Sequence, residues 1–132
     1  MNHEAVENKI SVLVVEMDPM CRRVVERILS SSCRITTCSD YAEILDLLQR
    51  IRFDTLFVDN DLPPPGVIAL FKEARQISPG TKRVLMTGEN VVNLQHYLDT
   101  GLVSAFVTRT TSSGEIEREV TTPVKKDIPL VR

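Results

Sequence analysis

Asp59 is the side chain of this sequence that is best placed to do chemistry. It ends the apolar run of residues 55–58, and Asn60 and Asp61 follow it directly. A carboxylate at the point where a buried strand reaches the surface is held rigidly, faces a crevice and can act as a nucleophile. The function of the chain therefore depends on which other groups converge on Asp59.

Composition restricts the classes of function that are open to the chain. Its 132 residues suit one domain, and 42% hydrophobic and 26% charged residues are ordinary for a soluble globular protein. A net charge of −2 gives no general reason to expect contact with nucleic acid or anionic lipid. No apolar run approaches the ~20 residues of a membrane span, and the polar N-terminus lacks the features of a signal peptide.

The cysteines favour a cytoplasmic location. Cys21, Cys33 and Cys38 are odd in number and lack C-x-x-C spacing, so we interpret them as reduced thiols. Metal ligation by these three thiols is not expected from their spacing. Any site must therefore be built from carboxylates and hydroxyls.

Two kinds of segment alternate along the chain. Short apolar segments, often β-branched, predict strands at residues 10–15, 34–38, 55–59, 83–87 and 103–108. Between them, apolar stripes of helical period predict helices centred on residues 24–29, 44–51, 67–74 and 91–98. Strand–helix alternation of this kind predicts an α/β domain with a parallel sheet.

Capping residues and the chain ends complete this division. Asp18-Pro19 and Asp40 with Glu43 predict helix starts, and Gly101 predicts a helix end. A weaker helix is expected at residues 112–120. We expect a polar tail at 1–8, one domain at 9–120 and a tail or linker at 121–132.

Polar residues follow the carboxyl ends of the predicted strands, which is where ligands bind to an open parallel sheet. They are Glu16 and Asp18 after the first strand, Asp59 at the third, Thr87 and Gly88 at the fourth, and Arg109 after the fifth. Carboxylates, a hydroxyl and a cation gathered at one edge suit a divalent metal ion and a phosphoryl group.

In these residues the chain resembles a response-regulator receiver domain of two-component signalling, over about residues 9–120. The motifs that carry the likeness are residues 12–16 with Asp18-Pro19, Phe53-Asp54, Asp59 with Pro63, residues 84–88, and Gly101 with residues 106–109. The resemblance implies a flavodoxin-like, doubly wound sheet of five parallel strands in the order 2-1-3-4-5, with helices on both faces.

The resemblance also implies roles for the strand-end residues. Asp59 would accept a phosphoryl group from a partner's phosphohistidine. Thr87, Gly88 and Arg109 would bind that group, with Arg109 standing where the family has Lys. Phe106 would be the aromatic residue that changes position on activation, and we expect it in the core.

The position of the family Lys is ambiguous in this sequence. Counting from Gly101 aligns it with Thr108, whereas counting from Phe106 aligns it with Arg109. We prefer Arg109 because that choice keeps the spacing between the aromatic residue and the cation. Arg keeps the charge of Lys but presents a planar fork, so the exchange is not conservative.

Mg²⁺ is the cofactor that the resemblance implies, with Glu16, Asp18, Asp59 and Asp61 as candidate ligands. The family has two adjacent acids after the first strand, and here Glu16 fits the first position while Met17 occupies the second. A thioether is a poor ligand for a hard cation that prefers oxygen. We therefore expect weak Mg²⁺ binding, with Asp18 either replacing the missing ligand or capping the following helix.

The resemblance also implies partners for the chain. A histidine kinase or phosphotransfer protein would supply the phosphoryl group. The face of the fourth helix, fifth strand and fifth helix would then bind a second copy or an output domain beyond the C-terminus. We expect no enzymatic activity, no direct contact with nucleic acid and no membrane contact.

Two alternatives stay open. Because Met17 removes an acid, the chain could be a degenerate receiver that acts as a phosphorylation-independent docking or dimerisation module. The second alternative is a phosphatase, since Asp59-Asn60-Asp61 matches the D-x-D motif of haloacid-dehalogenase-type enzymes. That motif normally lies on the first strand, whereas here it follows the third predicted strand.

Overall fold

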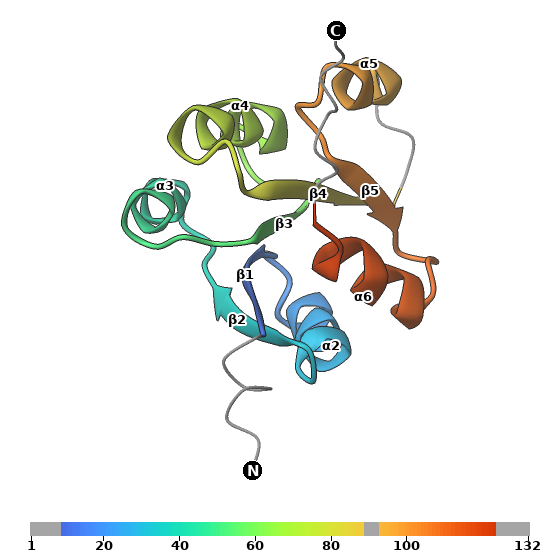
Figure 1. The fold of residues 1–132 in the computed structure, drawn as a ribbon. Helices are drawn as coiled ribbons and strands as arrows, with labels where there is room; N and C mark the ends of the chain where they lie inside the picture. Colours follow the sequence, from blue (N-terminus) through green and yellow to red (C-terminus); the bar gives the residue numbers. More distant parts are fainter. Residues whose placement is uncertain (1–8, 89–92, 124–132) are drawn as a thin grey trace, which may run out of the picture.

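The computed structural model describes residues 9–88 and 93–123, and in these ranges strands and helices alternate (Figure 1). The strands are β1 (Ile10–Val15), β2 (Cys33–Thr37), β3 (Thr55–Asp59), β4 (Lys82–Thr87) and β5 (Ala105–Thr108). The helices are α2 (Pro19–Leu29), α3 (Tyr41–Arg50), α4 (Val67–Ile77), α5 (Leu94–Asp99) and α6 (Ser113–Thr121). The expected stripe positions Val91 and Val92 lie outside the described residues. Among the residues described, no helix combines the length and apolar character needed to cross a membrane.

The five strands form one parallel sheet in the order β2-β1-β3-β4-β5, which confirms the predicted fold. The register sets Val15 opposite Val58 and Asp59 opposite Met86, so the carboxyl ends of β1, β3 and β4 meet at one edge. The residues that follow these ends are therefore neighbours in space although they are far apart in sequence.

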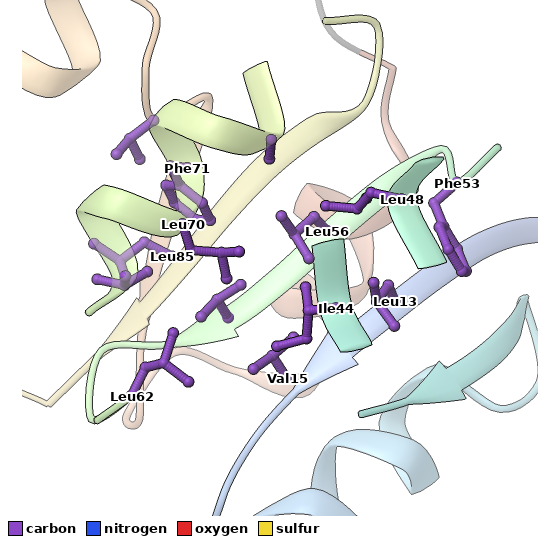
Figure 2. Close-up of a cluster of buried hydrophobic side chains, with 14 of the residues drawn as sticks. Leu13, Val15, Ile44, Leu48, Phe53, Leu56, Leu62, Leu70, Phe71 and Leu85 are labelled. Atoms are coloured by element: carbon purple, nitrogen blue, oxygen red, sulfur yellow. The ribbon is translucent and has the colours of Figure 1, made fainter. Parts of the chain in front are cut away.

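Side-chain alternation along the central strands builds two apolar layers. Leu13 and Val15 face α3 and α4, whereas Val12 and Val14 face α2 and α6. Figure 2 shows the first layer, in which side chains from α3 and α4 pack against β1, β3 and β4. Because both faces are covered, these strands are continuous apolar runs, as parallel strands usually are.

The predicted helix caps are present. Asp18 Oδ1 accepts a hydrogen bond from Met20 N at 2.9 Å, and Asp40 Oδ2 accepts one from Glu43 N at 3.0 Å. Gly101 follows α5 with a φ of 80°, a left-handed conformation that glycine adopts without strain. The weak final helix also forms, and α6 ends at Thr121.

The fifth strand is shorter than predicted. It begins at Ala105, because Leu102 and Val103 are buried in the preceding loop instead of pairing in the sheet. The guanidinium of Arg83 holds that loop by donating to the Leu102 and Gly101 carbonyls at 2.8 and 3.0 Å. The apolar character that suggested a strand at 103–104 therefore comes from loop burial.

A buried lysine anchors the last helix. Lys82 Nζ donates to the backbone carbonyl of Glu119 and, at 3.0 Å, to that of Thr122. Thr55 Oγ1 donates to the Val120 carbonyl at 2.8 Å. These donors satisfy carbonyls that a helix end leaves without partners, and they hold α6 against the amino ends of β3 and β4.

Two identical substitutions test this assignment of the core. Val58→Ala in β3 should lower the free energy of unfolding by about 1.5–3 kcal/mol, because Val58 is fully buried between the sheet and α4. Val24→Ala on the exposed side of α2 should change it by less than about 0.5 kcal/mol. Urea denaturation measures both values, and equal effects of the two substitutions would contradict the layer assignment.

Candidate functional site

The carboxyl edge of the sheet brings together polar residues from four strands. Glu16 follows β1, Asp59 ends β3, Thr87 ends β4 and Arg109 follows β5. Glu16, Asp59 and Thr87 are each only 2% exposed. Buried ionisable groups at one place need partners for their charge, so their contacts define the site.

Asp59 has a hydrogen-bond donor at each carboxylate oxygen. Oδ1 accepts from the backbone N–H of Asp61 at 2.8 Å, which closes the turn after β3. Oδ2 accepts from Arg109 Nη2 at 2.8 Å and forms an ion pair with it. The same nitrogen lies 3.5 Å from Asp61 Oδ2, so one guanidinium serves both acids.

Arg109, and not Thr108, is the residue that contacts Asp59. The Thr108 hydroxyl lies 3.0 Å from the hydroxyls of both Thr110 and Thr111, in the turn after β5. Arg109 follows β5 directly, and its side chain reaches the end of β3, where Nη2 contacts Asp59 Oδ2. Its alignment with the family Lys stays a prediction.

Cys21 is a site residue that the sequence pattern does not reveal. Arg109 Nη1 donates to Cys21 Sγ at 3.2 Å, and the Cys21 thiol lies 3.6 Å from Asp18 Oδ2. The hydrogen bond with Cys21, together with the negative charge of Asp59, raises the pKa of Arg109 above its ordinary value. The only sequence signal was the place of Cys21 in the first turn of the helix that follows Glu16.

Glu16 is held close to Asp59 with part of its carboxyl group unsatisfied. Its Oε2 accepts from Asp18 N at 3.1 Å, whereas Oε1 is buried with no hydrogen-bond partner among the described residues. Burial, followed by the neighbouring Asp59 carboxylate, raises the pKa of Glu16 to about 7. A proton on Glu16 would relieve the repulsion between the two carboxylates by hydrogen bonding to Asp59.

The expected oxygen ligands do not fit a Mg²⁺ site as they stand. Asp18 is occupied as the cap of α2, and this hydrogen bond to the Met20 backbone lowers its pKa. Asp61 is 79% exposed in its side chain and is turned toward Arg109. Within residues 9–88 and 93–123, no three His, Cys, Asp or Glu side chains gather where they could hold a metal ion. Glu16 Oε1 is the one buried side-chain oxygen without a hydrogen-bond partner in the described part of the chain, and it does not make such a set.

A hollow of about 480 Å³ lies beside Asp59 and is lined by Asn60, Asp61, Thr87, Gly88 and Arg109. A Cβ atom placed on Gly88 would lie 3.2 Å from Arg109 Nε, tighter than ordinary van der Waals contact. The absence of a side chain at Gly88 therefore lets the arginine lie across the end of β4. A hydroxyl, backbone groups and a cation line this hollow. Groups of these kinds can bind phosphoryl oxygens by hydrogen bonding and by charge.

Phe106 is not in the core, and that prediction was wrong. Its side chain is 41% exposed, whereas the next residue, Val107, is buried against α6. The sheet order makes β5 an edge strand, so alternation turns Phe106 away from the layer that Val107 joins. The expected order 2-1-3-4-5 already placed the fifth strand at an edge, but it did not specify which of its residues a helix would cover.

The sequence also matches a family model. The model of the response regulator receiver domain covers residues 12–121, which is most of the chain. The chain belongs to this family. Receiver domains are in general non-enzymatic signalling modules that interact with histidine kinases or phosphotransfer proteins, and they typically bind Mg²⁺ at an acidic site. Comparison with curated protein sequences gave no significant match.

Solved structures share the fold of this receiver. A response regulator receiver domain protein (CheY-like) from Methanospirillum hungatei is 17% identical with a TM-score of 0.75, covering 85% of this chain and 90% of the other. Adenylate cyclase from Rhodopirellula baltica is 23% identical with a TM-score of 0.77, covering 84% of each chain. The receiver of Saccharomyces cerevisiae Ssk1, crystallised with the phosphotransfer protein Ypd1, is similar at 16% identity and a TM-score of 0.73. That match covers 88% of this chain and 89% of the other. At these identities the likeness concerns the fold alone.

The raised pKa of Glu16 predicts a pH-dependent stability. The unfolded chain releases this proton near pH 4.5 and the folded chain near pH 7, so the folded state binds more protons in between. The contribution of Glu16 to stability should therefore be constant below about pH 4.5 and fall by about 1–3 kcal/mol as the pH rises to about 7. Glu16→Gln should remove this loss and be the more stable protein at pH 8.

Urea denaturation of the wild type and Glu16→Gln between pH 4.5 and pH 8 measures the difference. Glu115→Gln, at an exposed position of α6, serves as the control and should follow the wild type. A difference between the wild type and Glu16→Gln that stays the same at every pH would show that the pKa of Glu16 is not raised.

The cap role of Asp18 gives a separate prediction. Asp18→Asn should keep the stability of the wild type within about 0.5 kcal/mol, because asparagine caps helices as well as aspartate does. Asp18→Ala should lose about 1 kcal/mol. Thermal or urea unfolding compares them, and equal losses would mean that the charge of Asp18 matters more than its hydrogen bond to Met20.

Proposed function

We propose that this receiver domain accepts a phosphoryl group on Asp59. The observation that carries the proposal is the 2.8 Å ion pair between Asp59 Oδ2 and Nη2 of Arg109, a residue that lines the hollow. This ion pair holds the carboxylate in a fixed position with a cation next to it, which supports the proposal. An anionic reactant entering the hollow would meet that cation before it meets Asp59.

In the proposed reaction an oxygen of Asp59 forms a bond to phosphorus. The bond between phosphorus and the donor nitrogen breaks, and its electron pair leaves with the nitrogen. The guanidinium of Arg109 and the groups of Thr87 and Gly88 would then bind the oxygens of the transferred group. The hydrogen bond from Asp61 N would keep the carboxylate oriented throughout.

We propose a phosphohistidine of a histidine kinase or phosphotransfer protein as the donor. The similarity to the Ssk1 receiver, which was crystallised with the phosphotransfer protein Ypd1, supports this class of partner. The surface of α5, β5 and α6, where Phe106 is exposed, is the proposed output face for a second copy or an output domain.

Met17 favours a second candidate, in which the same fold serves as a phosphorylation-independent docking or dimerisation module. Met17 is 38% exposed and leaves Glu16 without the adjacent acid of the family. Under this candidate Asp59 and Arg109 would hold the loops at the sheet edge in one conformation. Binding to partners would then be the same before and after treatment of the wild type with an acyl phosphate.

Phosphorylation distinguishes the candidates. Incubation with a small acyl phosphate, once with Mg²⁺ and once with a chelator, should add one phosphoryl group to the wild type and none to Asp59→Asn. Asp46→Asn, which changes an exposed acid of α3, should be labelled like the wild type. Intact-mass spectrometry measures the adduct. A wild type that stays unlabelled in both conditions, while an ordinary receiver is labelled, would reject the first candidate and favour the second.

A further inference from the structure

We propose that the guanidinium of Arg109 is the resident cation of the Asp59 site, in the place of a bound divalent metal ion. The inference rests on the proposed function in that it concerns the charge balance of the same carboxylate. It departs from the typical Mg²⁺-dependent site of the family and assigns the role of the metal ion to a side chain of this chain.

The first argument is the occupancy of the Asp59 oxygens. Oδ2 is taken by Arg109 Nη2 at 2.8 Å, and Oδ1 is taken by the backbone N–H of Asp61 at 2.8 Å. A hard cation that binds Asp59 would have to share an oxygen with one of these donors and lie next to a fixed positive charge. Mg²⁺ also requires near-octahedral oxygen coordination, so it gains little from a single free oxygen.

The second argument is that the guanidinium is held on several sides. Nη1 contacts Cys21 Sγ at 3.2 Å in α2, while Nη2 spans Asp59 and Asp61 after β3. Its aliphatic stem crosses Gly88 at the end of β4. A planar fork with several donors makes these contacts together, which the single ammonium of a lysine cannot do.

The third argument is the set of remaining ligands. Met17 supplies no oxygen, and both carboxylate oxygens of Asp18 face donors of α2, namely Met20 N and the Cys21 thiol. Glu16 has one unclaimed oxygen, Oε1. The chain has thus lost an acid that would attract a dication, while it keeps a side-chain cation that repels one and whose fork contacts both Asp59 and Asp61.

The experiment titrates the purified chain with Mn²⁺, an oxygen-preferring substitute for Mg²⁺, and follows water-proton relaxation. The wild type should show no saturable binding up to about 10 mM, which corresponds to an affinity weaker than the millimolar range. Arg109→Met, which removes the charge but keeps an aliphatic stem, should bind Mn²⁺ at least about tenfold more tightly. Arg118→Met removes the same charge from the exposed surface of α6 and should behave like the wild type.

Saturable binding of Mn²⁺ to the wild type below about 1 mM would overturn the proposal. It would also be overturned if Arg109→Met bound no more tightly than the wild type. Should Arg109→Met fail to fold, Arg109→Gln replaces it, because glutamine also removes the charge and keeps a polar, hydrogen-bonding end on an aliphatic stem. The same tenfold gain is then expected.

Metal affinity and phosphoryl labelling are measured separately, so their failures can be distinguished. Absence of an acyl-phosphate adduct together with absence of Mn²⁺ binding would reject phosphoryl acceptance and leave the role of Arg109 intact. An adduct together with tight Mn²⁺ binding would support phosphoryl acceptance and reject the role of Arg109 as the resident cation.

Discussion

The ion pair between Asp59 and Arg109 is the interaction on which the candidate site depends. Two unit charges about 4 Å apart attract by about 4 kcal/mol at an effective dielectric constant of about 20. The Arg109 side chain stays 39% exposed, whereas burial of the Asp59 carboxylate costs several kcal/mol, so the pair adds little net stability. Its consequence is geometric. Asp59 is 2% exposed, and only a register that brings the residue after β5 to the end of β3 can compensate its charge.

The other features of the sheet edge follow from this pair. Glu16 is buried and faces the Asp59 carboxylate, so it keeps its proton to a higher pH than an ordinary glutamate does. Cys21 and Gly88 do not carry charge, but they decide where the guanidinium lies, one by hydrogen bonding and one by leaving space. A residue without reactivity of its own can therefore determine the chemistry of its neighbour.

The sequence predicted the fold well because its signals are local. The apolar runs of β1 and β3 and the caps Asp18 and Asp40 are each readable within a few residues. The strand order came from the resemblance to receiver domains, since periodicity does not specify neighbours. The exposure of Phe106 depends on that order, and the contact between Cys21 and Arg109 joins residues 88 positions apart. Long-range relations of this kind leave no trace in spacing.

Met17 and Arg109 acquire a common explanation once charge is considered. Each substitution alone would weaken metal binding by a receiver. Met17 removes an oxygen ligand, and Arg109 is a larger cation than Lys. Met17 lowers the negative charge of the site, and Arg109 keeps the charge of Lys while its larger fork hydrogen bonds to both Asp59 and Asp61. A guanidinium is attached to the chain, so it needs no binding equilibrium to be present. Compensation of the Asp59 charge then depends on the conformation of the turn after β5, not on the concentration of a free ion.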